Sequence, residues 1–241
     1  MKHAGRQSLR RPWPVRLSEG PVGLRPLRTR DAGAWRQVRS RNLAWLQPWE
    51  ATPPPGVDPR PRSFRAMTRS LRAQARVGLC LPFVVTYADS GSDPDATTAR
   101  AERLVGQLTV SGITLGSARW AQIGYWIDQA YAGRGIMPTA VALACDHCFF
   151  VLGLHRIEIN IRPENAASLR VVDKLGFRRE GIRPRYLHID GDWRDHVAYA
   201  LHAEEVPEGV LTRWRRRRAM EERHRGTSAP GTSAPQQGPS A

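Results

Sequence analysis

The sequence is poor in cysteine. Its 241 residues include only Cys80, Cys145 and Cys148. This number is too small, and odd, for a disulfide framework. Cys145 and Cys148 form a C-x-x-C pair, but they lie within a predicted helix and no second ligand pair accompanies them, so two small buried side chains are favoured over a metal or redox site. We therefore expect no metal and a reducing, cytoplasmic environment.

Signals for membrane insertion or export are also missing. No apolar run is long enough to cross a bilayer. The segment 1–16 carries basic residues and prolines, but it lacks the hydrophobic stretch of a secretory signal. We expect no membrane partner.

Lysine is scarce, because Lys2 and Lys174 are the only ones, yet the formal net charge is +15. Arginine supplies almost all of this charge. An anionic partner such as ribosomal RNA is one explanation, and a GC-rich genome that favours arginine codons is the other. The composition leaves both open.

The order of elements predicts an α/β fold, a mixed sheet with helices packed on it. An apolar content of 41% is enough for a substantial core, and there is no internal repeat. Alternation and helical periodicity predict strands at 22–27, 81–87, 104–113, 120–127 and 154–162 and helices at 32–45, 63–76, 137–152 and 165–175. A final hairpin, 183–189 and 193–202, should turn at Asp190-Gly191, a strong hairpin signal.

Composition divides the chain into a single domain with two extensions. We expect a flexible arm at 1–18, a domain at 19–206 with a mobile polar insertion at 89–101, and a basic, largely disordered tail at 207–241. The arginine cluster 213–218 in that tail would contact RNA phosphates or would simply be a solvated charge run.

A glycine loop at a strand-to-helix junction is the first feature that suggests chemistry. Tyr131-Ala132-Gly133-Arg134-Gly135 lies between the strand 120–127 and the apolar helix that begins near Met137. A helix start offers unpaired N–H groups and the positive end of the helix dipole, and glycines let the backbone approach an anion closely. This loop is therefore a candidate site for a polyphosphate.

The elements after the loop give it a family context. A strand, then Asn165-Ala166-Ala167-Ser168, a short helix and Leu175-Gly176-Phe177 follow in that order. This order resembles the GNAT superfamily of acetyl-CoA-dependent N-acetyltransferases. The segments 42–50 (NLAWLQPWE) and 186–197 (YLHIDGDWRDHV) are similar to the Pro-Trp-Glu stretch and the closing signature of RimJ-type enzymes in the RimJ/RimL ribosomal-protein-alanine N-acetyltransferase family. The resemblance implies one GNAT domain with a mostly antiparallel, twisted sheet.

The same resemblance implies a site for acetyl-CoA, the co-substrate. Backbone groups of the loop would hold its pyrophosphate, and Ile127 before the loop would pair with the pantetheine arm. Asn165 and Ser168 would contact the pantetheine and the leaving sulfur, although Asn165 also fits an ordinary helix N-cap. Ala130 stands where the superfamily usually has Gln or Arg, so no side-chain contact is expected there. The loop residues implied are Ala132, Gly133, Arg134, Gly135, Ile136 and Met137.

The general base is not fixed by the resemblance, because Arg185 stands where some RimL-type relatives have a glutamate. Glu50 is the first candidate, since the Pro-Trp-Glu segment is expected on the substrate side; a surface carboxylate is the alternative. The weaker candidates are Tyr186 and Asp190, and the histidines His188 and His196 are more often structural in such strands. Trp45, Trp49 and Trp193 would either shape a peptide entrance or belong to the core.

The resemblance implies acetylation of a protein N-terminal α-amine, with a ribosomal protein that begins with alanine as the expected partner. Two alternatives stay open. The first is a small-amine or antibiotic N-acetyltransferase, and the second is a ribosome- or RNA-associated binding protein with little catalysis.

Overall fold

The computed structural model describes residues 13–58, 63–89 and 102–227. Apart from Asp89, the insertion expected at 89–101 lies outside the described residues, as do segments 1–12 and 228–241.

The described part of the chain forms one eight-stranded sheet in the order β1-β2-β3-β4-β5-β6-β8-β7. Every neighbouring pair is antiparallel except β5 and β6, which are parallel. The expected mixed, mostly antiparallel sheet is thus confirmed. The strands are β1 (Leu17–Glu19), β2 (Val22–Pro26), β3 (Cys80–Ala88), β4 (Glu102–Thr114), β5 (Trp120–Ile127), β6 (Arg156–Ile161), β7 (Arg178–Ile189) and β8 (Asp192–His202).

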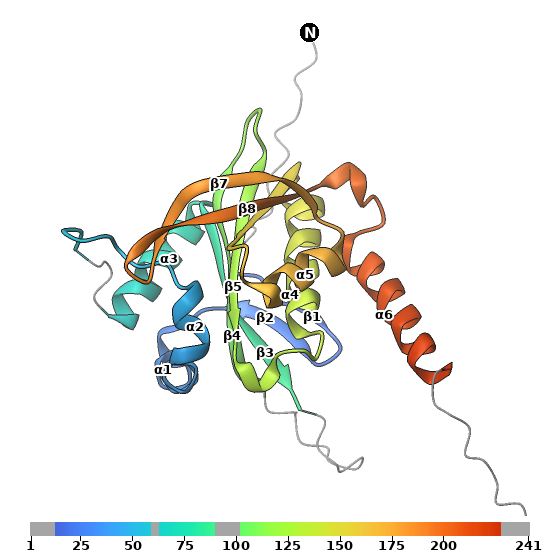
Figure 1. Cartoon of the computed structure of the whole chain (residues 1–241), viewed down its shortest axis with the longest axis horizontal. Coiled ribbons are helices and arrows are strands. Elements are labelled where there is room, and N and C mark those ends of the chain that lie inside the picture. Colours follow the sequence, from blue (N-terminus) through green and yellow to red (C-terminus); the bar gives the residue numbers. More distant parts are fainter. Residues whose placement is uncertain (1–12, 59–62, 90–101, 228–241) are drawn as a thin grey trace, which may run out of the picture.

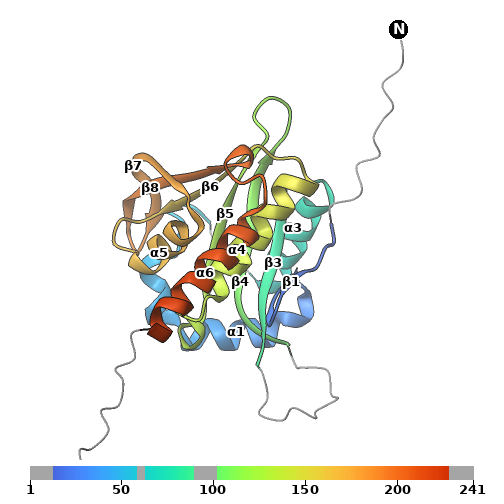
Figure 2. The same ribbon diagram turned by 90° about the vertical axis from the view of Figure 1, so that its right-hand side faces the viewer.

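Helices cover both faces of the sheet (Figures 1 and 2). One group packs on one face and a second group on the opposite face, around a larger apolar core. The first group is α1 (Ala32–Arg41), α2 (Leu43–Leu46) and α3 (Phe64–Arg76), and the second is α4 (Ile136–Asp146), α5 (Ala166–Leu175) and α6 (Val210–Thr227). In α4 every residue from Ile136 to Cys145 is buried, as expected of a helix that is apolar all round.

The only parallel pair in the described sheet separates soon after it begins. Register contacts between β5 and β6 are limited to Trp120, Ala121 and Gln122 on β5. Beyond Gln122 the second half of β5 pairs only with β4, and the second half of β6 pairs only with β8. The sheet therefore opens between the two strands towards the end of β5 that leads into the glycine loop.

The structure differs from the sequence-based expectation in four segments, three of which lie before residue 152. The helix expected at 32–45 is interrupted at Asn42, whose buried side-chain amide bonds to the Val38 carbonyl and the Asp128 carboxylate. The helix expected at 137–152 ends in a π-helical turn at 147–151. The segment 13–18, expected within a flexible arm, packs the Trp13 ring 5.2 Å from that of Phe83 and enters β1 at Leu17.

The fourth difference is α6, which occupies 210–227 in the tail that was expected to be largely disordered. Its anchor is Trp214, which is 2% exposed and donates a 2.9 Å hydrogen bond to the Thr139 hydroxyl of α4. Asp146 at the end of α4 accepts from the first backbone N–H groups of α6, those of Val210 and Leu211. One large side chain and a carboxylate cap thus hold an arginine-rich helix against the domain.

Candidate functional site

The glycine loop has the geometry of an anion cradle. Gly133 and Gly135 have φ angles of 77° and 76°, a left-handed conformation in which other residues are strained. Gly135 is the N-cap of α4 and has no side chain to satisfy the first N–H groups of the helix. A Cβ at Gly135 would also come within 3.4 Å of the Trp214 ring. The loop therefore leaves the amides at the start of α4 available for an external anion.

The start of α5 lies beside this cradle. The Asn165 side chain caps the helix by accepting from the Ser168 N–H at 3.0 Å, so the N-cap interpretation of Asn165 is confirmed. The Ser168 carbonyl accepts from the Tyr125 hydroxyl at 3.5 Å, and burial raises the pKa of Tyr125, which stays neutral. The Ser168 hydroxyl has no hydrogen-bond partner within the described residues, so it is available to a ligand.

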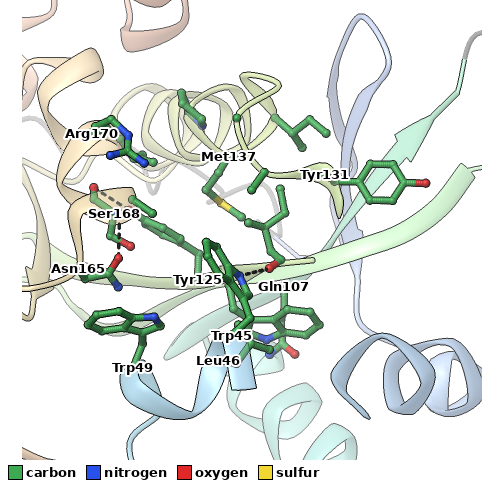
Figure 3. Close-up of a pocket in the computed structure, with 18 of the residues that line it drawn as sticks. Trp45, Leu46, Trp49, Gln107, Tyr125, Tyr131, Met137, Asn165, Ser168 and Arg170 are labelled. Carbon is green, nitrogen blue, oxygen red and sulfur yellow. Dashed lines mark hydrogen bonds between the residues drawn. The ribbon is translucent and has the colours of Figure 1, made fainter. Parts of the chain in front are cut away.

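One cavity of about 380 Å³ joins the two faces of the sheet at the opening between β5 and β6. We call it the central cavity (Figure 3). It includes Tyr125, which packs with the α4 side of the sheet, and Trp126, which packs with the α1 and α3 side. Its loop end is lined by Tyr131, Ala132, Gly133, Gly135, Ile136, Met137, Pro138, Asn165, Ala167, Ser168, Arg170, Val171 and Lys174. Its aromatic end is lined by Trp35, Arg39, Trp45, Leu46, Trp49, Glu50, Met67, Gln107 and Trp126.

The end of β5 presents its backbone to this cavity. The Ile127 carbonyl accepts from the Trp45 indole at 3.1 Å, whereas the Asp128 N–H bonds to the Val105 carbonyl of β4. Successive residues of a strand direct their N–H and C=O groups to opposite sides. The Ile127 N–H therefore lies on the side of the opening, next to a carbonyl that is already bonded to protein.

The aromatic end contains one ion pair. The guanidinium of Arg39 lies 5.3 Å from the centroid of Trp35 and 5.4 Å from that of Trp126, and it pairs with the Glu50 carboxylate. The Arg39 side chain is only 15% exposed, whereas that of Glu50 is 46% exposed. Two rings thus hold the arginine in place, and the arginine holds a carboxylate that solvent still reaches.

Other residues singled out from the sequence lie away from the cavity. Arg134 is exposed and stacks on the Tyr131 ring at 5.0 Å. Tyr186 is not among the lining residues; its hydroxyl accepts from Arg183 at 3.3 Å and its ring packs on His196. A catalytic role for Tyr186 stays a prediction without support from this placement.

The hairpin histidines and the turn are engaged in structural contacts. The His188 ring is hydrogen-bonded to Thr52, and the His196 ring contacts the Arg194 carbonyl at 3.1 Å. Burial lowers the pKa of His196. Asp190 accepts from Gln47 at 3.0 Å and so ties the hairpin tip to the segment after α2. Trp193 is 43% exposed and does not line the cavity.

Several lining residues had no signal in the sequence. Arg39, Met67 and Gln107 come from three elements that meet only in the folded sheet, so no local spacing relates them to the glycine loop. Tyr125 and Trp126 lie in a strand that was expected. That both would line one cavity depends on the opening next to β6, which the sequence does not show. Arg170 and Lys174 follow Ala167 on α5 by three and seven residues, which places all three on one helix face, and this was the one available cue.

Neither a metal site nor a membrane-spanning helix is found among the residues that the structure describes. No group of three or more His, Cys, Asp or Glu side chains is arranged to hold a metal ion in segments 13–58, 63–89 and 102–227. No helix among these residues has both the length and the apolar character needed to cross a bilayer.

A nucleotide-type cradle, an opened parallel strand pair and a cavity through the sheet define an acyl-transfer fold of the GNAT class. The family model described as Acetyltransferase (GNAT) domain matches residues 22–178, and the chain belongs to this family. It is an N-acetyltransferase that uses acetyl-CoA. The unpaired loop amides and the free Ser168 hydroxyl fit this co-substrate.

The chain is similar to several N-acetyltransferases, among them a RimJ enzyme. The structure of Mycobacterium smegmatis RimJ in complex with CoA-disulfide is 40% identical, with a TM-score of 0.72 over 84% of this chain and 94% of that chain. The [ribosomal protein uS5]-alanine N-acetyltransferase of Escherichia coli (strain K12) is 30% identical over 78% of this chain and 90% of its own length. The probable N-acetyltransferase YjcK of Bacillus subtilis (strain 168) is 43% identical over 104 residues, which is 43% of this chain and 58% of that relative.

Proposed function

We propose that this enzyme transfers the acetyl group of acetyl-CoA to the N-terminal α-amine of a ribosomal protein that begins with alanine. The observation that carries the proposal is the central cavity, which runs from the phosphate cradle on one face of the sheet to a single carboxylate on the other. Two substrates can therefore approach one point from opposite faces. A ribosomal substrate would place the reaction in the cytoplasm.

In this proposal the loop end binds the co-substrate. The backbone amides of Gly133, Arg134, Gly135, Ile136 and Met137 hold the pyrophosphate, while Lys174 and Arg170 add positive charge at the same end. The Ala132 N–H, which the sequence also implied, is instead donated to the Gln129 carbonyl at 3.1 Å. The Ile127 N–H faces the pantetheine and polarises the thioester carbonyl, a contribution that is typically worth a few kcal/mol of transition-state stabilisation. Asn165 fixes the start of α5, and with it Ser168.

The transfer then needs one group that accepts a proton from the amine and one that donates a hydrogen bond to the leaving sulfur. The amine nitrogen forms a bond to the acyl carbon, the carbon–sulfur bond breaks, and the amine loses one proton. We assign Glu50, directly or through water, as the acceptor of that proton, because it is the only carboxylate among the described residues that line the cavity. The Ser168 hydroxyl donates to the leaving sulfur.

An α-amine suits a site with so modest a base. With a pKa of about 7.7 to 8.0, about a quarter of an α-amine is neutral near pH 7.4, against about a thousandth of a lysine side chain with pKa near 10.4. The partly exposed Glu50 therefore needs to remove a proton only after attack, when the nitrogen is acidic. This supports N-terminal over lysine acetylation.

The charge of the cavity disfavours the small-molecule alternative. Polyamines and aminoglycosides are polycations, and sites that bind them need several carboxylates. Here Arg39, Arg170 and Lys174 outnumber Glu50. A peptide N-terminus carries at most one positive charge and brings its own carbonyl groups, which matches a cavity with one carboxylate and several cations.

The test is thiol release from acetyl-CoA with short peptides that begin with Ala, Ser or Lys. We expect release with the Ala peptide, weaker release with Ser, and none when the Ala peptide is N-terminally blocked but retains an internal lysine. Release with an aminoglycoside or spermidine and with no peptide would overturn the proposal. Turnover of Ser but not Ala peptides would overturn the alanine assignment alone.

A further inference from the structure

A row of arginines on α3 forms a second charged feature, separate from the central cavity. Arg65, Arg69, Arg72 and Arg76 are spaced by four, three and four residues, which places them on one face of the helix over about 16 Å. All four are exposed. With Thr29 and Arg30, which precede α1, they line a groove that we call the arginine groove.

The arginines of this groove have no partners. Within segments 13–58, 63–89 and 102–227, no carboxylate or hydrogen-bond acceptor pairs with Arg30, Arg65, Arg69, Arg72 or Arg76. The cluster on α6 is the opposite case. Its arginines pair with Glu205 and Leu175 carbonyls (Arg213), Glu19 (Arg215), Glu208 (Arg216), Asp173 and Glu221 (Arg217) and Glu222 (Arg218). The sequence made 213–218 the candidate for RNA contact, but Arg215, Arg216, Arg217 and Arg218 pair with carboxylates, and Arg213 is bonded to backbone carbonyls.

The lining of the groove indicates the chemistry of its partner. Apart from Thr29 it consists of guanidinium groups, and no aromatic or aliphatic side chain lines it. The cores of protein–protein interfaces are depleted of charged residues and contain aromatic anchors beside their arginines. A phosphodiester backbone needs only a row of cations, because its affinity comes from phosphate neutralisation and counterion release. The groove therefore favours a polyphosphate chain over an acidic protein surface.

Helix α3, which supplies most of the groove, also lines the aromatic end of the central cavity, together with α1, which directly follows Thr29 and Arg30. Met67 of α3 and both Trp35 and Arg39 of α1 line that end, and the two helices lie on the same side of the sheet (Figure 1). The opposite face of α3 packs inward through Phe64, Met67 and Leu71. A nucleic acid held by the groove would thus lie on the acceptor side of the enzyme.

We propose that the arginine groove binds the phosphate backbone of RNA next to the protein that is acetylated. This inference rests on the proposed function, because a ribosomal protein presents its N-terminus beside ribosomal RNA. The groove then serves as a docking surface, separate from the site that binds acetyl-CoA.

The test measures binding of the full chain to a fluorescein-labelled 20-nucleotide oligouridylate by anisotropy, as a function of salt. Five phosphate contacts on a single strand predict a slope of log Kobs against log salt of about −3.5, at roughly 0.7 per contact. Replacing Arg65, Arg69, Arg72 and Arg76 by Gln should reduce the slope to about −0.7. Gln and Arg have similar helix propensity, and circular dichroism would confirm that the variant is folded.

Two matched variants and a second labelled polymer serve as controls for this measurement. Replacing Arg215, Arg216, Arg217 and Arg218 by Gln removes the same charge from α6 and should leave the slope unchanged. Replacing the four α3 arginines by Lys keeps the charge and should retain binding. An unchanged slope in the α3 Gln variant, an equal loss in the α6 variant, or equal binding of a labelled polyglutamate would each overturn the proposal.

Different results would refute the docking surface and the proposed function. Acetylation of a free Ala peptide should be the same in the wild type and in the α3 Gln variant, because a short peptide brings no RNA. If the wild type acetylates the Ala peptide but shows no salt-dependent binding to the oligouridylate, only the docking surface is refuted. RNA binding without acetylation of any peptide would refute only the proposed acceptor.

Discussion

At the scale of single residues, the catalytic proposal depends on Glu50. Glu50→Gln keeps the shape and cannot accept a proton. We expect kcat/KM for an Ala peptide to fall about a hundredfold, the lower end for general-base catalysis, because a free α-amine is already partly neutral. KM for acetyl-CoA should not change. Steady-state kinetics across pH 6 to about 9 would check this, with Glu222→Gln as the control; a loss of less than about threefold would exclude Glu50 as the base.

Ser168 is tested through the leaving group. Ser168→Ala leaves the N–H that Asn165 caps and removes only the unpartnered hydroxyl. A hydrogen bond to a charged group contributes about 1.5 to 3 kcal/mol, so kcat should fall about tenfold to a hundredfold with little change in KM for acetyl-CoA. Ser70→Ala, an exposed serine of α3, is the control. A change in KM for acetyl-CoA with kcat intact would assign Ser168 to binding instead.

The sequence predicted the residues of the site that lie in local motifs and missed those that depend on packing. Gly133, Gly135, Asn165 and Ser168 lie at strand and helix ends, where a few neighbouring residues determine the conformation. Arg39 was not predictable, because its place depends on two tryptophans from different elements. Side chains that meet only through tertiary packing leave no periodic pattern in the sequence that would identify them.

At the scale of elements, α6 supports the glycine loop at the start of α4. Trp214 donates to the Thr139 hydroxyl, and Thr139 in turn donates to the Gly135 carbonyl at 2.9 Å. Trp214→Ala should lower the free energy of unfolding by about 3 to 5 kcal/mol, the usual loss for a buried Trp, and raise KM for acetyl-CoA. Denaturant unfolding and kinetics would measure both. Trp193→Ala, at an exposed site, should change the free energy of unfolding little. Equal losses of stability in the two variants would show that α6 does not support the glycine loop through Trp214.

The same helix shows where element prediction fails. The alternating strands and the Asp190-Gly191 hairpin were predicted, since both signals are local, and the two turn residues have φ angles of 49° and 82°. An arginine-rich segment with one tryptophan shows no apolar stripe, so a helix at 210–227 was not expected. Tertiary burial of Trp214 stabilises it instead.

At the scale of the whole molecule, the opening in the sheet was beyond sequence reasoning. The residues of β5 and β6 continue to alternate after their register contacts end at Gln122 and Glu158. Nothing in that alternation marks where pairing stops. The loop, which the sequence does reveal, and the opening, which it does not, together create the cavity between the two faces.

An ion network that joins β6, β7 and the segment after β8 predicts how the whole fold responds to acid. Arg156 pairs with Glu180 and Glu158, and Arg178 pairs with Glu180 and Glu205. Hydrogen bonds from Arg156, opposed by partial burial and aided by Arg178, lower the pKa of Glu180 to about 2. An unfolded glutamate has a pKa of about 4.3. The folded pKa is the lower one, so this contribution to stability is complete above the unfolded value and disappears as the pH falls towards 2.

Glu180→Gln should therefore be less stable than the wild type near pH 7, and the difference should shrink as the pH falls from about 5 to 2.5. Thermal unfolding at a series of pH values measures it, with Glu204→Gln, at an exposed carboxylate, as the matched control. Because Glu180 lies in the closing strands rather than in the central cavity, kcat for an Ala peptide at pH 7 and 25 °C should stay near the wild-type value. Parallel wild-type and variant curves over this pH range would show that the network does not contribute to acid stability.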